Sequence, residues 1–160
     1  MSLTVALAAA GHDARAQAAS VRATAQVSIP IAVAGLAPLA FGQLLPGVAR
    51  TVAATATSSG RLRVIARGGS TVRLTVTFPA TLARGVETMP VDNWAVHVNT
   101  NANTAGSTPI TVASGVPFDR ALPASGRLFF FVGARVVPAP TQPAGAYTGT
   151  IVLAAAYTGT

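Results

Sequence analysis

The segment Gly145-Ala-Tyr-Thr-Gly-Thr-Ile-Val-Leu-Ala-Ala-Ala-Tyr157 decides the fold, because its residues alternate with a period of two. One side carries the larger residues Tyr147, Ile151, Leu153 and Tyr157, and the other side carries only Thr, Val and Ala. This period is typical of a β-strand with one packed face. The preceding Pro143-Ala-Gly145 predicts a turn.

The same alternation recurs along the chain and predicts further strands at 51–57, 61–66, 71–78, 93–98, 108–113 and 128–137. Because Gly68-Gly-Ser70 separates two of these runs, we expect 61–66 and 71–78 to form a β-hairpin. No segment after residue 18 has a convincing helical period. Short strands separated by turn signals favour an all-β fold, with a single β-sandwich domain over residues 19–160.

Three large side chains are expected in the core. Phe78, Trp94 and Leu153 each lie on the apolar side of an alternating run, so we expect them to be buried. The run 128–137 differs, because three consecutive phenylalanines, 129–131, place bulk on both of its faces. We therefore expect that strand to be covered on both sides or to contact a partner.

The composition restricts the classes of function. Charged residues make up only 9% of the 160 residues, against a usual share of about 25%. The net charge is +7 and every basic residue is Arg. These arginines are scattered, with no basic run and no interleaved aromatic residues, so we expect no nucleic-acid partner. The absence of cysteine excludes disulfides and thiolate chemistry.

The N-terminal region resembles a processing segment. An apolar run at 3–10 is followed by Ala16-Gln17-Ala18, which fits a signal-peptide cleavage site before Ala19. No positively charged region precedes the apolar run, so residues 1–18 are interpreted as a truncated signal peptide. We therefore expect a secreted protein that passes through the periplasm to the cell surface or the exterior. No run reaches the ~20 apolar residues that a transmembrane helix needs.

Residues suited to catalysis are few after position 18. His97 is the one histidine there, and Glu87, Asp92 and Asp119 are the acids. No Gly-x-Ser-x-Gly nucleophile motif accompanies them. We expect His97 to be a solvent-facing strand residue on the face opposite Trp94, and we expect no enzyme activity, no cofactor and no metal site.

Four arginines surround the expected hairpin. Arg61, Arg63 and Arg67 share one face, and Arg73 is expected to join them across the turn. One interpretation is an electropositive patch for an acidic glycan or envelope polymer. The favoured interpretation is a solvated outer face whose charges discourage wrong strand pairing.

The segment Val21 to Val33 alternates for about twice the length of an ordinary strand. Its apolar side is interrupted by no charge, although Pro30 on the other side weakens pairing at that point. This side consists of Val21, Ala23, Ala25, Val27, Ile29 and Ile31. We interpret these residues as a donor face that pairs with another subunit.

Three segments together resemble a known family. They are Leu39-Ala-Phe-Gly-Gln-Leu-Leu-Pro-Gly47, Met89-Pro-Val-Asp-Asn-Trp94 and Pro143-Ala-Gly-Ala-Tyr-Thr-Gly-Thr-Ile-Val-Leu153. Over about residues 19–157 the chain resembles an exported bacterial domain family of unknown function, itself similar to the spore coat protein U domain and to archaic chaperone–usher pilins. Unlike many relatives, this chain has no disulfide.

The resemblance implies an immunoglobulin-like, pilin-like sandwich that is incomplete as a monomer. The protein would then be a non-enzymatic structural subunit of a bacterial surface fibre or coat, assembling by β-strand addition into a homopolymer or with related subunits. A periplasmic chaperone and an outer-membrane usher would be partners, and Tyr157 would be a chaperone or strand contact, although it is not penultimate. The alternative is a self-complete sandwich that acts as an adhesin or glycan-binding module through loop 99–107 or the arginine face.

Overall fold

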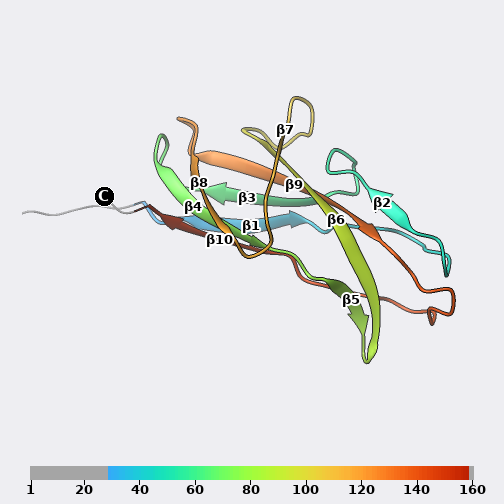
Figure 1. The fold of residues 1–160 in the computed structure, drawn as a ribbon. Coiled ribbons are helices and arrows are strands. Elements are labelled where there is room, and N and C mark those ends of the chain that lie inside the picture. Colours follow the sequence, from blue (N-terminus) through green and yellow to red (C-terminus); the bar gives the residue numbers. More distant parts are fainter. Residues whose placement is uncertain (1–28, 159–160) are drawn as a thin grey trace, which may run out of the picture.

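The computed structural model describes residues 29–158, which form ten β-strands and no helix (Figure 1). The strands are β1 (Ala32–Ala37), β2 (Arg50–Val52), β3 (Gly60–Ile65), β4 (Thr71–Thr77), β5 (Thr81–Arg84), β6 (Glu87–Asn99), β7 (Thr108–Ile110), β8 (Pro117–Ala121), β9 (Arg127–Val136) and β10 (Val152–Tyr157). The expected all-β class is confirmed.

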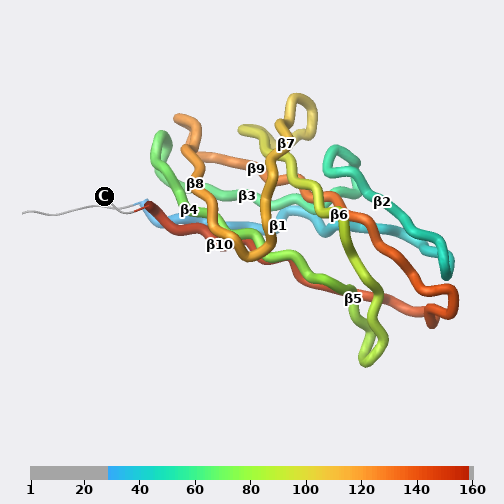
Figure 2. Tube along the Cα trace, in the orientation of Figure 1, coloured from blue at the N-terminus to red at the C-terminus, as the bar shows by residue number. Residues whose placement is uncertain are grey.

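All strand pairs are antiparallel, and they form two sheets. The larger sheet has the order β1-β3-β9-β6-β5, with β2 beside β9 and β7 beside β6. The smaller sheet has the order β10-β4-β8. Side chains from both sheets meet in one core cluster, which includes Val64 from β3, Leu74 from β4 and Phe130 from β9. Figure 2 follows the chain through both sheets.

The hairpin expected between 61–66 and 71–78 is wrong, although both strands exist. β3 pairs with β1 and β9, whereas β4 pairs with β10 and β8 in the other sheet. The turn between them crosses from one sheet to the other and lies against the β8–β9 turn, where a Cβ on Gly68 would lie 2.1 Å from the carbonyl oxygen of Ala124. The apolar faces of β3 and β4 therefore meet across the core, and the two strands are not neighbours within one sheet.

Other boundaries also differ from the sequence expectation. The run 51–57 forms a strand only as far as Val52, because the chain turns at Ala53 and Ala56, whose backbone groups are joined by a hydrogen bond of 3.0 Å. β6 begins earlier than expected and is interrupted by a bulge at Asn93, which has a φ of 50°. β5 and β8 were not expected, and β1 begins only at Ala32, so it lies mostly beyond the strand expected at 21–33, whose residues 29–31 are not in a strand. β5 joins β6 through Gly85 and Val86, a two-residue turn of the kind that glycine at its first position favours.

The core predictions are largely confirmed. Phe78 and Leu153 are buried, whereas Trp94 is only half-buried. The indole of Trp94 stacks on the ring of Phe78 with centroids 4.6 Å apart. β9 is covered on both faces as expected: Phe130 belongs to the main core, and Phe129 and Phe131 are buried on the other face with Ala54.

Candidate functional site

An unpaired seam lies between β1 of the larger sheet and β10 of the smaller sheet. β1 is an edge strand of the larger sheet and β10 is an edge strand of the smaller sheet. They lie close enough for contact, but no ladder joins them within residues 29–158. Each strand therefore presents unpaired backbone N–H and C=O groups along its free edge, which is a template for an additional strand.

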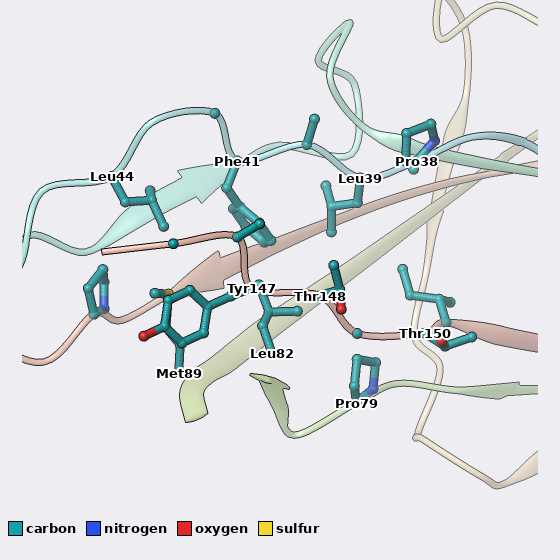
Figure 3. A pocket seen from close by; sticks show the side chains of 18 of the residues that line it. Pro38, Leu39, Phe41, Leu44, Pro79, Leu82, Met89, Tyr147, Thr148 and Thr150 are labelled. Atoms are coloured by element: carbon teal, nitrogen blue, oxygen red, sulfur yellow. The ribbon is translucent and has the colours of Figure 1, made fainter. Parts of the chain in front are cut away.

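The seam continues into an apolar groove with a volume of about 890 Å³. One wall is the segment 35–46, which follows from β1, and the other wall is the segment 143–151, which leads into β10. Leu82, Met89 and Trp94 also line the groove. Figure 3 shows side chains from both walls and from the β5–β6 hairpin converging on this space.

The wall formed by 35–46 is held by backbone bonds to distant parts of the chain. Ala40 N–H donates to the carbonyl of Ser58 at 3.0 Å, and Gly47 N–H donates to the carbonyl of Ala139 at 3.0 Å. Gly42 has a φ of 71°, a left-handed conformation that glycine adopts without strain. The chain can therefore bend there. Phe41 packs in a second core cluster, which also contains Val52, Met89, Val91, Ala134 and Val136.

The wall formed by 143–151 is fixed to β5. Ala83 and Thr148 exchange two backbone hydrogen bonds, of 2.8 and 3.0 Å. The hydroxyl of Tyr147 donates to the carbonyl of Pro143 at 2.9 Å, and the guanidinium of Arg84 lies 5.8 Å from the centroid of the Tyr147 ring. Strand pairing with β4 begins only at Val152, so the strand expected over 145–157 is shorter than its sequence pattern.

The inward face of β1 is incompletely covered beside the groove. Val33 pairs with Val64, which is fully buried, yet Val33 itself is 40% exposed. Gly35 pairs with Leu62 on the same face, lines the groove, and has no heavy atom within 4 Å of an added Cβ. Space for side chains that the described residues do not supply therefore lies next to an unpaired strand edge.

The expected donor residues fall into two groups. Val21, Ala23, Ala25 and Val27 lie outside the described residues. Ile31 is half-buried against the main core cluster of its own domain, and Ile29 is 53% exposed.

Tyr157 makes hydrogen bonds within its own chain. Its hydroxyl donates to the carbonyl of Ile29 at 2.8 Å and accepts from the backbone N–H of Arg67 at 2.9 Å. Tyr157 therefore lies at the end of the seam where the N-terminal segment enters the domain.

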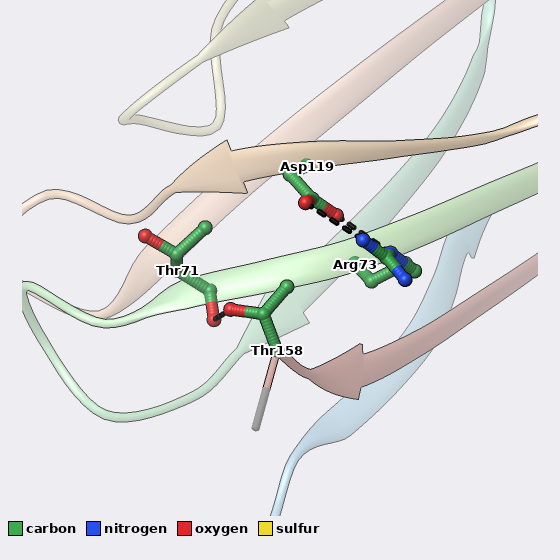
Figure 4. A network of polar contacts seen from close by, with 4 residues as sticks. All are labelled: Thr71, Arg73, Asp119 and Thr158. Atoms are coloured by element: carbon green, nitrogen blue, oxygen red, sulfur yellow. Dashed lines mark hydrogen bonds and ion pairs between the residues drawn. The ribbon is translucent and has the colours of Figure 1, made fainter. Parts of the chain in front are cut away.

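The four arginines do not form one patch. Arg61 and Arg63 lie on the outer face of β3, opposite Phe131 and Phe129 of β9. Their stems can flank the aromatic rings, but the Nε atoms of both arginines are buried without a hydrogen-bond partner among the described residues. Arg73 lies in the other sheet, so the expectation that it joins them across a hairpin is wrong (Figure 4).

Two cross-strand ion pairs involve the two aspartates among the acids considered for catalysis. The guanidinium of Arg73 binds Asp119 with two hydrogen bonds of 2.8 and 2.9 Å, and that of Arg135 binds Asp92 with bonds of 2.8 and 2.7 Å. These hydrogen bonds lower the pKa of both carboxyl groups below their usual range. Arginine contacts thus account for both carboxylates without a histidine partner.

His97 lies on the outer face of β6, as its alternation with Trp94 predicted, but it is half-buried rather than solvent-facing. Its Nδ1 is 3.2 Å from Oγ of Ser107. In loop 99–107, the side-chain amide of Asn99 donates to the carbonyls of Asn103 and Ala105, both at 2.9 Å. Within residues 29–158, no three His, Asp or Glu side chains are grouped so that they could hold a metal ion.

Sequence reasoning missed most of the groove. Leu82 and Met89 are cross-strand partners in the β5–β6 hairpin, Tyr147 comes from a distant segment, and their shared position was not anticipated. The available signal was the run from Thr81 to Met89, where Gly85 separates two short β-rich stretches. In the part of the chain that the structure covers, no helix is long and apolar enough to cross a membrane.

Comparison with known proteins places the whole β-domain in one family. No curated protein matches the chain. The model of the family described as a domain of unknown function, DUF4402, matches residues 16–157 and so spans all ten strands. The chain therefore belongs to the DUF4402 family.

Proposed function

We propose that the protein is a secreted, non-enzymatic structural subunit that assembles by β-strand addition between copies. Its two sheets would form an immunoglobulin-like sandwich, similar to pilins and spore coat U domains, that lacks one strand between β1 and β10. The observation that carries this proposal is the groove that lies beside two unpaired strand edges. An added strand would satisfy backbone groups along these edges and cover apolar side chains in the groove.

The donor would be the alternating segment that precedes the described residues. The contact of Ile31 with its own core narrows the donor face to the apolar residues from Val21 to Val27. Their spacing of two matches the way a β-strand presents alternate side chains to one surface. A periplasmic chaperone and an outer-membrane usher would keep such an exposed edge from random pairing before assembly.

A pair of full-length variants tests this function. Gly35→Trp would fill the groove from a position with open space, while the donor segment remains intact. Val27→Asp would place a charge in the centre of the donor face, while the groove remains intact. We expect each variant alone to be monomeric, and an equimolar mixture to form dimers in which Gly35→Trp donates and Val27→Asp accepts. Ala32→Trp, on the opposite and exposed face of β1, is the matched control and should assemble like the wild type.

Analytical ultracentrifugation of the separate and mixed variants gives the result. Dimers that appear only in the mixture support strand addition. Wild-type protein that stays monomeric at all concentrations, or a mixture without dimers, would refute it and favour the self-complete binding module. Unchanged polymers of both variants would equally refute it, because assembly would then use another surface.

A further inference from the structure

The start of the described chain is fixed by one hydroxyl group. Tyr157 Oη–H donates to the carbonyl of Ile29 at 2.8 Å, and the same oxygen accepts from the N–H of Arg67 at 2.9 Å. Three segments that are distant in sequence therefore meet at this atom: the entry to β1, the turn after β3 and the end of β10. The hydroxyl of the neighbouring Thr158 donates instead to the carbonyl of Thr71 at 3.0 Å (Figure 4).

This junction lies at the end of the seam away from the groove. The lining of the groove begins at Gly35 and includes neither Ile29 nor Tyr157. From Ile29 the chain enters β1 and runs toward the groove, so Ile29 lies at the end of β1 that is farther from the groove. Figures 1 and 2 show the start of β1 beside the end of β10.

The local sequence adds stiffness at the same point. Proline fixes its own φ, and its ring disfavours the helical region for the residue before it. Ile29-Pro30 is therefore biased toward an extended conformation. To reach its own groove, the segment before Ile29 would have to reverse direction here. A reversal at this point would have to overcome that bias, and it would compete with the bond that holds the carbonyl of Ile29 to Tyr157.

We propose that Tyr157 is a positioning residue that directs the N-terminal segment out of its own domain, so that it fills the groove of a second copy rather than its own. This inference rests on the proposed function. The hydrogen bond from the Tyr157 hydroxyl favours binding of the N-terminal segment to a second copy over binding to the groove of its own chain. The net effect of one such hydrogen bond corresponds to about a two- to tenfold change in that equilibrium.

Disulfide trapping in the full chain tests the role of Tyr157. The chain contains no cysteine, so Gly35→Cys can be combined with a single cysteine at Ala23, Ala25 or Val27 in turn. A bond within one chain gives a cross-linked monomer, whereas bonds between chains give a ladder on a non-reducing gel. Each pair is measured in the wild-type, Tyr157→Phe and Thr158→Val backgrounds. Tyr157→Phe keeps the ring and removes only the hydroxyl.

We expect a ladder in the wild-type and Thr158→Val backgrounds, and a two- to tenfold larger fraction of internally bonded monomer with Tyr157→Phe. Equal monomer fractions in all three backgrounds, or a wild-type chain that is already mostly internally bonded, would overturn the role of Tyr157. An equal increase with Thr158→Val would also overturn it, because general loosening of the strand end would then suffice. If no pair forms either kind of bond in any background, the groove does not bind this segment and the proposed function itself fails.

Discussion

Substitution of Trp94 by alanine measures how far the groove reaches into the core. Truncation of a fully buried Phe or Trp to alanine costs about 3–5 kcal/mol. Trp94 is partly exposed, so a loss at or somewhat below the lower end of that range applies, and the stack on Phe78 accounts for about 0.5–1.5 kcal/mol of it. We therefore expect Trp94→Ala to lower the free energy of unfolding by about 2–3 kcal/mol.

The assay is urea denaturation of full-length protein followed by far-UV circular dichroism, with Val27→Asp present in every sample so that assembly does not contribute. Phe130→Ala is the comparison, because Phe130 is 1% exposed in the centre of the main core and should show the full loss of about 3–5 kcal/mol. A loss below about 0.5 kcal/mol for Trp94→Ala would show that the indole does not pack on Phe78. A loss equal to that of Phe130→Ala would show that Trp94 is fully covered and that the groove is closed.

Two further predictions concern the surface and the sheet. Asp92 and Asp119 have a lowered pKa in the folded state, so their arginine pairs stabilise the fold above the unfolded pKa of about 3.9, and this contribution is lost as pH falls through the folded pKa. The urea concentration at the denaturation midpoint should therefore decrease as the pH is lowered below about 4, and it should decrease less in Asp119→Asn. Ordinary pKa values for both aspartates in an NMR titration would contradict this prediction. Gly133→Ala should destabilise the domain by about 1–3 kcal/mol in the same urea assay, because its Cβ would lie 2.4 Å from the backbone nitrogen of Ala54. Gly35→Ala, with open space around it, is the control, and equal stability of the two variants would refute the close approach.

The strands themselves were largely predictable, because burial on one face leaves a local record. Val72, Leu74, Val76 and Phe78 alternate in sequence, and all four are buried on the same side of the smaller sheet. The two faces of β9 were also predictable, because consecutive phenylalanines require cover on both sides. Shorter strands such as β8 (Pro117–Ala121) were not found, since they have too few residues to show a period.

Strand partners were not predictable, because an alternating strand buries its apolar face equally well beside a neighbour or across a core. The segments 61–66 and 71–78 show this: glycines between them suggested a hairpin, and contact with the β8–β9 turn instead sends the chain into the opposite sheet. The residue types around positions 61–73 were therefore sufficient to predict which side chains face the core. They were insufficient to predict the sheet to which each strand belongs.

The sequence by itself determined that this chain is built of strands, which side chains face inward, and that catalytic and metal-binding residues are scarce. Only the tertiary structure decided where the groove and the unpaired strand edges lie. The groove needs β1, the β5–β6 hairpin and the segment before β10 to meet, and these lie at opposite ends of the chain and in its middle. A period of two records which face of a strand is buried, but it carries no record of which edge is left unpaired, because edge exposure depends on the order of strands in space.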